Sequence, residues 1–173
     1  IVLDRIGDLL LMQRDPSAAL KLFHEKQELI VRLVKSDPDN ALWQRDLAVS
    51  YEKMGDVLRA LRDLPAALNS FRDGLVLLER LAKSDPANAN WQRDLSTSHE
   101  KIGAALAAQG HLSDALKSYH ESLAIRQRLT KSQPSNTQWR SDVAKVYNNM
   151  CWAQALAGVL EPAIADCNES LRW

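Results

Sequence analysis

Apolar residues recur at three- and four-residue spacing along most of the chain. Between positions 41 and 61 the recurring apolar residues are Leu47, Tyr51, Met54 and Leu58. This spacing is the apolar stripe of an amphipathic helix. A second stripe of the same kind begins at Leu64 and reaches Leu81. No segment alternates apolar and polar residues with period two, so the pattern predicts an all-α fold.

Proline and short polar residues mark where these helices begin and end. Pro38 and Asn40 precede the first stripe, and Arg62-Asp63 separates it from the second. Pro65 suits the first position of a helix, and the residue before Pro86 resists helical geometry. Each helix would contain about 20 residues and span roughly 30 Å.

The helix pair is repeated with a period of 48 residues. Trp43, Trp91 and Trp139 are spaced by that step, and residues 36–83 share 24 identities with residues 84–131. A fixed period of this length indicates stacked units that bury their faces against neighbours. We expect one array, 1–173, with repeats at about 1–35, 36–83, 84–131 and 132–173. The first and last repeats are incomplete, so we expect an excerpt of a longer protein.

The second unit resembles the tetratricopeptide repeat (TPR) family. The residues that carry the resemblance are Tyr51, Gly55, Ala67, Phe71 and Pro86. They match the family's order of aromatic, glycine, alanine, aromatic and proline. The units are longer than ordinary repeats and are similar to the lengthened repeats of large bacterial signalling proteins and of kinesin light chains. The resemblance implies a right-handed α-α superhelix whose first helices line a concave face.

The same resemblance implies a non-catalytic scaffold that binds a protein or peptide on this concave face. Family members that grip chaperone tails use lysine and asparagine as a carboxylate clamp. Here Asp8, Asp56 and Glu100 occupy matching places and would repel a carboxylate, so we exclude the clamp. The candidate partner-binding residues are Arg45, Glu52, Lys53, Asp56, Arg59, Arg93, Glu100, Lys101, Lys145, Asn148, Asn149 and Trp152.

Trp152 is the most specific of these candidates. Earlier units hold Asp56 and Ala104 at its place. Tryptophan is enriched among interface hot spots, which favours a partner-binding anchor. The alternative is that Trp152 packs on nearby alanines or on a following unit.

Two other functions remain open from the sequence. The array is also consistent with a sensory or autoinhibitory arm of a multidomain signalling or effector protein. Self-association is a weaker alternative, because apolar residues such as Ile6, Leu9 and Leu171 begin and end the array without a polar cap.

Charge and hydropathy exclude several partner classes. Lysine plus arginine equals aspartate plus glutamate at 22 each, whereas nucleic-acid binding normally needs a basic surplus. No run of 18 apolar residues predicts a membrane span, and no signal peptide is visible. We expect a cytoplasmic protein without nucleic-acid or membrane partners.

The sequence offers no catalytic, cofactor-binding or metal-binding constellation. There is no glycine-rich phosphate loop and no nucleophile paired with a base. His24 and His120 fall on an outer face that also accepts arginine and asparagine. Cys151 and Cys167 stand where the third repeat has Gly103 and Tyr119. Buried reduced thiols are the favoured interpretation, and a disulfide or redox switch is the alternative.

Recurring tryptophans and aspartates predict contacts between units. We expect Trp43, Trp91 and Trp139 to be buried at junctions against Leu33, Leu81 and Leu129, although an aromatic ladder for a ligand would give the same recurrence. Asp46, Asp94 and Asp142 also recur, with Arg45 and Arg93 beside the first two, and are expected to form hydrogen bonds or salt bridges between repeats.

Overall fold

The computed structural model describes residues 2–13 and 15–173, and this part of the chain contains eight α-helices and no strand. The all-α prediction is therefore confirmed. The chain divides into two compact units, Ile1–Ser84 and Asp85–Trp173. The helices are α1 (Val2–Met12), α2 (Pro16–Ser36), α3 (Ala41–Ala60), α4 (Leu64–Ser84), α5 (Ala89–Ala108), α6 (Leu112–Ser132), α7 (Thr137–Leu156) and α8 (Leu160–Arg172).

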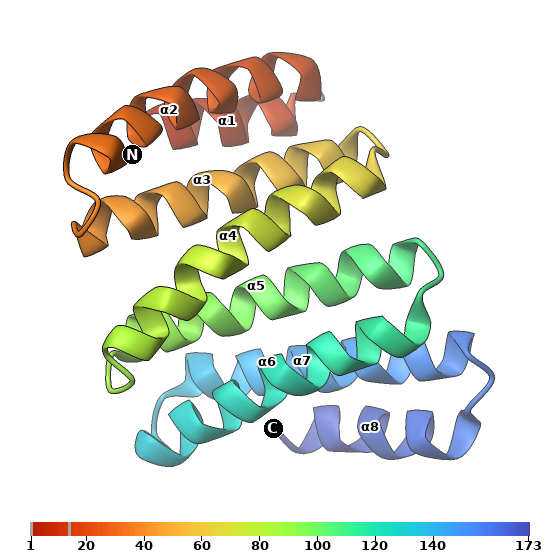
Figure 1. Ribbon diagram of the computed structural model, residues 1–173. Helices are drawn as coiled ribbons and strands as arrows, with labels where there is room; N and C mark the ends of the chain where they lie inside the picture. Colours follow the sequence, from red (N-terminus) through yellow and green to blue (C-terminus); the bar gives the residue numbers. More distant parts are fainter. Residues whose placement is uncertain (1, 14) are drawn as a thin grey trace. The chain divides into compact units, whose positions relative to one another are not determined.

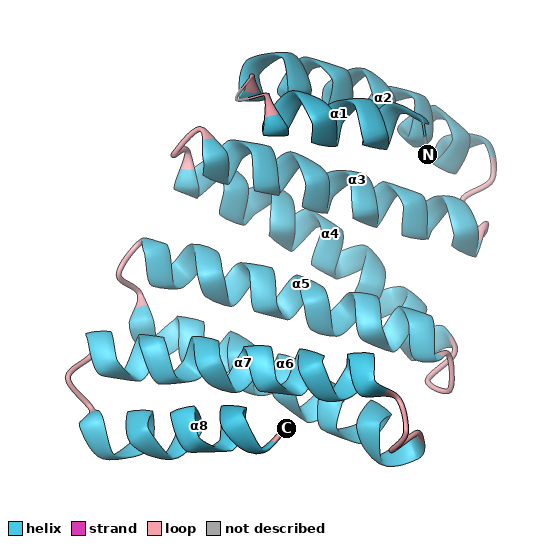
Figure 2. Ribbon diagram, turned by 180° about the vertical axis from the view of Figure 1, so that it is seen from behind, coloured by secondary structure: helices cyan, strands magenta, loops and turns pink. Residues whose placement is uncertain are grey.

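Each unit contains two helix pairs. In the first unit α1 pairs with α2 and α3 pairs with α4, while α2 also packs against α3 (Figure 1). The second unit repeats this order with α5, α6, α7 and α8, and α6 packs against α7. Seen from behind, α3 lies in front of α4 and α7 in front of α6 (Figure 2). The boundary between the two units lies after Ser84, one residue beyond the expected end of the second repeat. A single continuous superhelix over all four repeats stays a prediction.

The proline–asparagine–tryptophan motif starts the first helix of each complete pair. The side chains of Asn40, Asn88 and Asn136 are N-caps of α3, α5 and α7. Each accepts a hydrogen bond from the backbone N–H of the tryptophan three residues later, over 3.2, 3.3 and 3.1 Å. An N-cap side chain satisfies one of the four N–H groups that have no partner within the helix. The repeated motif therefore fixes where these helices begin.

Glycine lets the two helices of a pair approach closely. A Cβ atom added at Gly55 would collide with the ring of Phe71, and one added at Gly103 would lie 2.6 Å from Tyr119 Cε1. Phe71 is fully buried and Tyr119 is almost so. In both pairs an aromatic ring thus packs directly against a glycine of the first helix.

The repeated tryptophans are less buried than the sequence predicted. Trp43, Trp91 and Trp139 are all partly buried, because each sits in the first turn of its helix, near the end of the pair. Trp139 lines a small cavity together with Leu129, as expected from the sequence. Leu33, the expected partner of Trp43, is exposed.

Candidate functional site

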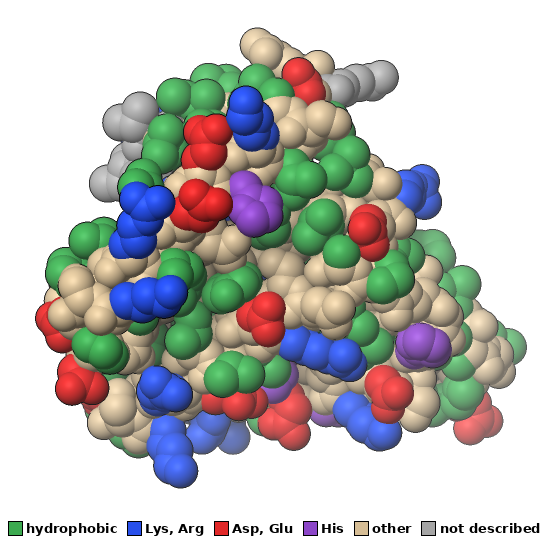
Figure 3. All heavy atoms as spheres, turned by 45° about the horizontal axis from the view of Figure 1, so that its top comes forward, with side chains coloured by type: hydrophobic (Ala, Val, Ile, Leu, Met, Phe, Trp, Pro, Cys, Tyr) green, Lys and Arg blue, Asp and Glu red, His purple; other side chains and the backbone are tan. Residues whose placement is uncertain are grey.

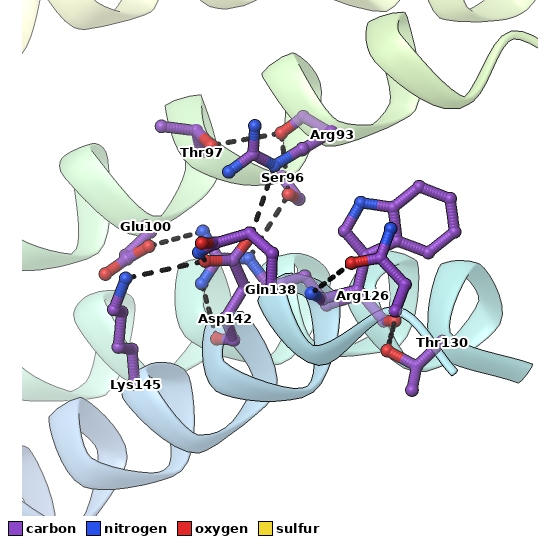
Figure 4. Close-up of polar contacts among 11 residues, drawn as sticks. Arg93, Ser96, Thr97, Glu100, Arg126, Thr130, Gln138, Asp142 and Lys145 are labelled. Atoms are coloured by element: carbon purple, nitrogen blue, oxygen red, sulfur yellow. Dashed lines mark hydrogen bonds and ion pairs between the residues drawn. The ribbon is translucent and has the colours of Figure 1, made fainter. Parts of the chain in front are cut away.

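The first helices of the second unit carry a connected set of polar side chains (Figure 4). Its centre is Asp142, which is 6% exposed. Asp142 accepts hydrogen bonds from Arg93 Nε at 3.2 Å and from Gln138 Nε2 at 2.9 Å. Lys145 Nζ lies 3.5 Å from the same carboxylate. The Arg93–Asp142 bridge joins α5 to α7, so the predicted salt bridge between repeats is confirmed here.

A buried arginine completes this cluster from α6. Arg126 is 4% exposed. Its guanidinium donates to the backbone carbonyl of Asp142 at 2.6 Å and to Ser96 Oγ at 3.3 Å. It also forms an ion pair of 2.5 Å with Glu100. Three helices therefore meet at one side chain, and a buried charge paired in this way is costly to leave without its partner.

The electrostatic environment keeps Asp142 ionised. Burial by itself would raise the pKa of this carboxyl, because it removes water from the charged form. The hydrogen bond from Gln138 and the charges of Arg126 and Arg93 outweigh burial and hold the pKa below its ordinary value. Asp142 is thus a fixed negative centre between two positive exposed side chains.

Two further polar pairs join neighbouring first helices. In the second unit Asn149 Nδ2 donates to Glu100 Oε1 at 3.0 Å. In the first unit Lys53 Nζ lies 2.6 Å from Asp8 Oδ1, which joins α3 to α1. Several residues predicted to bind a partner therefore also contact an adjacent helix.

The predicted partner-binding residues differ widely in their exposure. Glu52 is buried and offers no surface. The partly buried ones are Arg45, Lys53, Asp56, Lys101, Glu100 and Asn149. The exposed ones are Arg59, Arg93, Lys145, Asn148 and Trp152. Four of these five lie in the second unit.

An exposed stripe on α7 is the best-formed surface for a partner. Lys145, Asn148, Trp152 and Leu156 are separated by three or four residues and so share one helix face. Trp152 is 64% exposed, which rules out burial of its ring on neighbouring alanines. The stripe, defined here as these four residues, combines an apolar ring, an amide and a positive charge.

The favoured interpretation of the cysteines as free thiols was wrong. Cys151 on α7 and Cys167 on α8 form a disulfide, with their Cα atoms 5.3 Å apart. That separation lies within the range that a disulfide can span. The reason is geometric, since the glycine and aromatic positions that the cysteines replace face each other across each helix pair.

Other surfaces give no comparable site. An open groove of about 390 Å³ in the first unit lies between α2 and Tyr51, and its lining mixes charges of both signs. His24 at its edge is exposed, as expected from the sequence. Figure 3 likewise shows acidic and basic side chains interspersed on the face that it presents.

The described residues offer neither a metal site nor a membrane span. No three histidine, cysteine or acidic residues come together in a way that could hold a metal ion. None of the described helices has the length and apolar character needed to cross a membrane.

Sequence reasoning missed Arg126 although the repeat contained a signal. The corresponding positions of earlier repeats are Ile30 and Leu78, both apolar. A charged residue at a position that is otherwise apolar indicates a buried polar contact.

Comparison with known proteins agrees with this architecture. Residues 100–133 match the family model described as tetratricopeptide repeat. No curated protein matches the chain. Among solved structures, BtubC (BKLC) from P. vanneervenii is similar with a TM-score of 0.74 and 16% identity, over 96% of this chain and 59% of BtubC.

A second solved structure is similar over the same share of the chain. It is the Rap conjugation gene regulator of the plasmid pLS20 in complex with the Phr* peptide. Its TM-score is 0.66 with 15% identity, and the match covers 96% of this chain and 40% of that one. The chain thus spans well under two thirds of both proteins. At such identities the likeness establishes the fold, which confirms the resemblance to helical TPR proteins.

Proposed function

We propose that this chain, which carries a tetratricopeptide repeat at residues 100–133, is a non-catalytic scaffold that binds an extended peptide segment of a partner protein. The observation that carries the proposal is the exposed Trp152 on α7. A large apolar ring facing solvent on a well-packed helix is a typical anchor for a partner.

The neighbours of Trp152 indicate the chemistry of the partner. Asn148 lies one turn away and can both donate to a peptide carbonyl and accept from a peptide N–H. Lys145 lies one turn further and adds a positive charge that is only partly neutralised by Asp142 at 3.5 Å. The stripe therefore suits an extended segment with an apolar residue over Trp152 and an acidic or carbonyl group near Lys145.

The similarity to the Rap conjugation gene regulator, whose structure is of a complex with the Phr* peptide, supports a peptide as the partner class. A similar fold can serve a different partner, so the stripe and not the fold carries the proposal. We place this activity in the cytoplasm, in keeping with the expectation from the sequence.

A peptide-library selection tests the proposal. Wild-type protein should enrich peptides with a shared apolar position, and the Trp152→Ala/Asn148→Ala variant should lose them. Asn148 is chosen instead of Asn149, because Asn149 donates to Glu100 and its loss would disturb the helix contact. Val76→Ala, which removes an exposed apolar side chain on α4 in the first unit, is the matched control and should retain the selected peptides. Equal enrichment by wild type and the double variant would refute the proposal.

Self-association through the first and last helices is a second candidate function. Ile6 and Leu9 on α1 and Leu160, Ile164 and Leu171 on α8 are exposed apolar residues. Ile6 and Leu9 correspond to Met54 and Val57 on α3, and Ile6 corresponds also to Met150 on α7. All three of these counterparts are buried. Sedimentation over a range of concentrations should show reversible association that Ile164→Asp removes. A strict monomer at millimolar concentration would contradict it.

A further inference from the structure

The fourth repeat replaces a packing contact with a covalent one. In the second and third repeats the pair is Gly55 with Phe71 and Gly103 with Tyr119, and in each an aromatic ring fills the space above the glycine. The fourth repeat has Cys151 and Cys167 at these places, joined by a disulfide. Two cysteine side chains without the bond fill this space less well than a ring does.

Few buried side chains hold α8 against α7. Of its residues, all of which are described, only Ala163 is buried. The part of α6 that aligns with α8 has four buried residues, which are Ala115, Tyr119, Ser122 and Leu123. On α8 the residue that corresponds to Leu123 is Leu171, which is 86% exposed. The disulfide therefore adds a covalent contact to limited packing between α8 and α7.

We propose that Cys151 and Cys167 form a reversible thiol–disulfide site that decides whether α8 stays packed on α7. The site would react with small dithiols and with small-molecule disulfides. This inference does not depend on the proposed peptide-binding function.

The chemistry balances as two thiol–disulfide exchanges. Cys151 is buried and Cys167 is partly exposed, so a thiolate of a dithiol attacks Sγ of Cys167. This step breaks the bond between the two sulfurs and releases the Cys151 thiolate, which takes up a proton. The second thiolate of the dithiol then attacks the dithiol sulfur that is bonded to Cys167. This step frees Cys167, which takes up a proton, and leaves the dithiol as a cyclic disulfide. The protein thus gains two electrons and two protons. Glutathione disulfide reoxidises the two thiols by the same two exchanges in reverse, and is itself reduced to two molecules of glutathione.

Hydrogen exchange of the full chain tests the proposal. Backbone amides of α8 should exchange on the order of 100-fold faster after treatment with a dithiol, as expected for removing a cross-link that closes a short loop. Amides of α4 in the other unit should not change. Mass spectrometry after thiol alkylation should show two free thiols in the reduced protein and none after glutathione disulfide is added.

Two double variants distinguish the effect of the disulfide bond from the effect of the side chains at these positions. Cys151→Gly/Cys167→Phe restores the pair found in the second repeat, so α8 should exchange slowly with or without the dithiol. Cys151→Ser/Cys167→Ser should exchange fast under both conditions. The proposal is overturned if α8 exchanges equally in the oxidised and reduced wild type, or if glutathione disulfide leaves both thiols free.

Discussion

Arg62 adopts a backbone conformation that glycine adopts more easily. Its φ is 67°, in the left-handed region, and the corresponding residues of the next two repeats are Gly110 and Gly158, with φ of 81° and 76°. A side chain costs about 1–2 kcal/mol in this conformation because Cβ crowds the following carbonyl. The turn after α3 therefore carries strain that the turns after α5 and α7 avoid.

The Arg62→Gly variant should stabilise the protein slightly. The gain should be up to about 1 kcal/mol, because relief of the strain is partly offset by the greater freedom of glycine in the unfolded chain. The midpoint of denaturant unfolding measures it. Arg62→Ala is the control and should have little effect, since alanine keeps the Cβ. If alanine stabilises the protein as much as glycine does, the arginine side chain and not the backbone conformation causes the loss of stability.

The Asn136 cap permits a second prediction at this scale. Asn136→Ala should cost about 1 kcal/mol, because the Trp139 N–H loses its side-chain acceptor. Asn136→Asp keeps an acceptor and should cost much less. The comparison is made by thermal and denaturant unfolding, and equal losses in the two variants would exclude capping as the cause.

At the scale of helices, the second unit is held by a polar cluster as well as by apolar packing. Arg126 reaches from α6 to Glu100 on α5 and to the backbone of α7. Asp142 on α7 binds back to Arg93 on α5. These contacts fix the spacing of three helices, and the exposed stripe of α7 is positioned by them.

Stability of the second unit should consequently depend on pH through Asp142. The pKa of this carboxyl is lower in the folded protein than its ordinary value of 3.8. The ionised carboxyl therefore stabilises the folded state fully above pH 3.8, and this stabilisation is lost as the pH falls through the lowered pKa of the folded state. Asp142→Asn should destabilise the protein at pH 7 by about 1–3 kcal/mol, since it removes the buried negative charge that accepts from Arg93 and Gln138 and lies beside the buried Arg126. The variant should also lose less stability than wild type between pH 5 and 3.

Unfolding measured at several pH values provides the test. Asp114→Asn is a suitable control, because Asp114 is an exposed carboxylate that pairs with Lys117 on the same helix. If Asp142→Asn and wild type lose stability in parallel below pH 5, the cluster does not have the electrostatic role described.

At the scale of the whole molecule, the repeats explain what could be predicted from sequence. Helix boundaries follow from a motif that recurs with Asn40, Asn88 and Asn136, because capping is local and depends on a few neighbouring residues. Departures from the repeat could not be predicted in the same way. Arg126 depends on contacts between three helices. The repeat places Cys151 and Cys167 at facing positions, but whether two thiols there form a bond depends on their separation in space, which is 5.3 Å between Cα atoms.

The exposed stripe on α7 could be predicted only in part. Periodicity placed Lys145, Asn148 and Trp152 on one face of a helix, and the structure has all three exposed. Periodicity alone could not show that Glu52 would be buried or that Asn149 would be bound to Glu100. Which side chains remain available to a partner depends on neighbouring helices.

The central claim is that Trp152 anchors a partner peptide without supporting the fold. Titration calorimetry of a selected peptide, with denaturant unfolding of the same samples, tests it most directly. The Trp152→Ala variant should bind at least about 30-fold more weakly, the 2 kcal/mol typical of a hot spot, while its unfolding midpoint stays that of wild type. Unchanged affinity, or a large loss of stability in Trp152→Ala, would contradict the account.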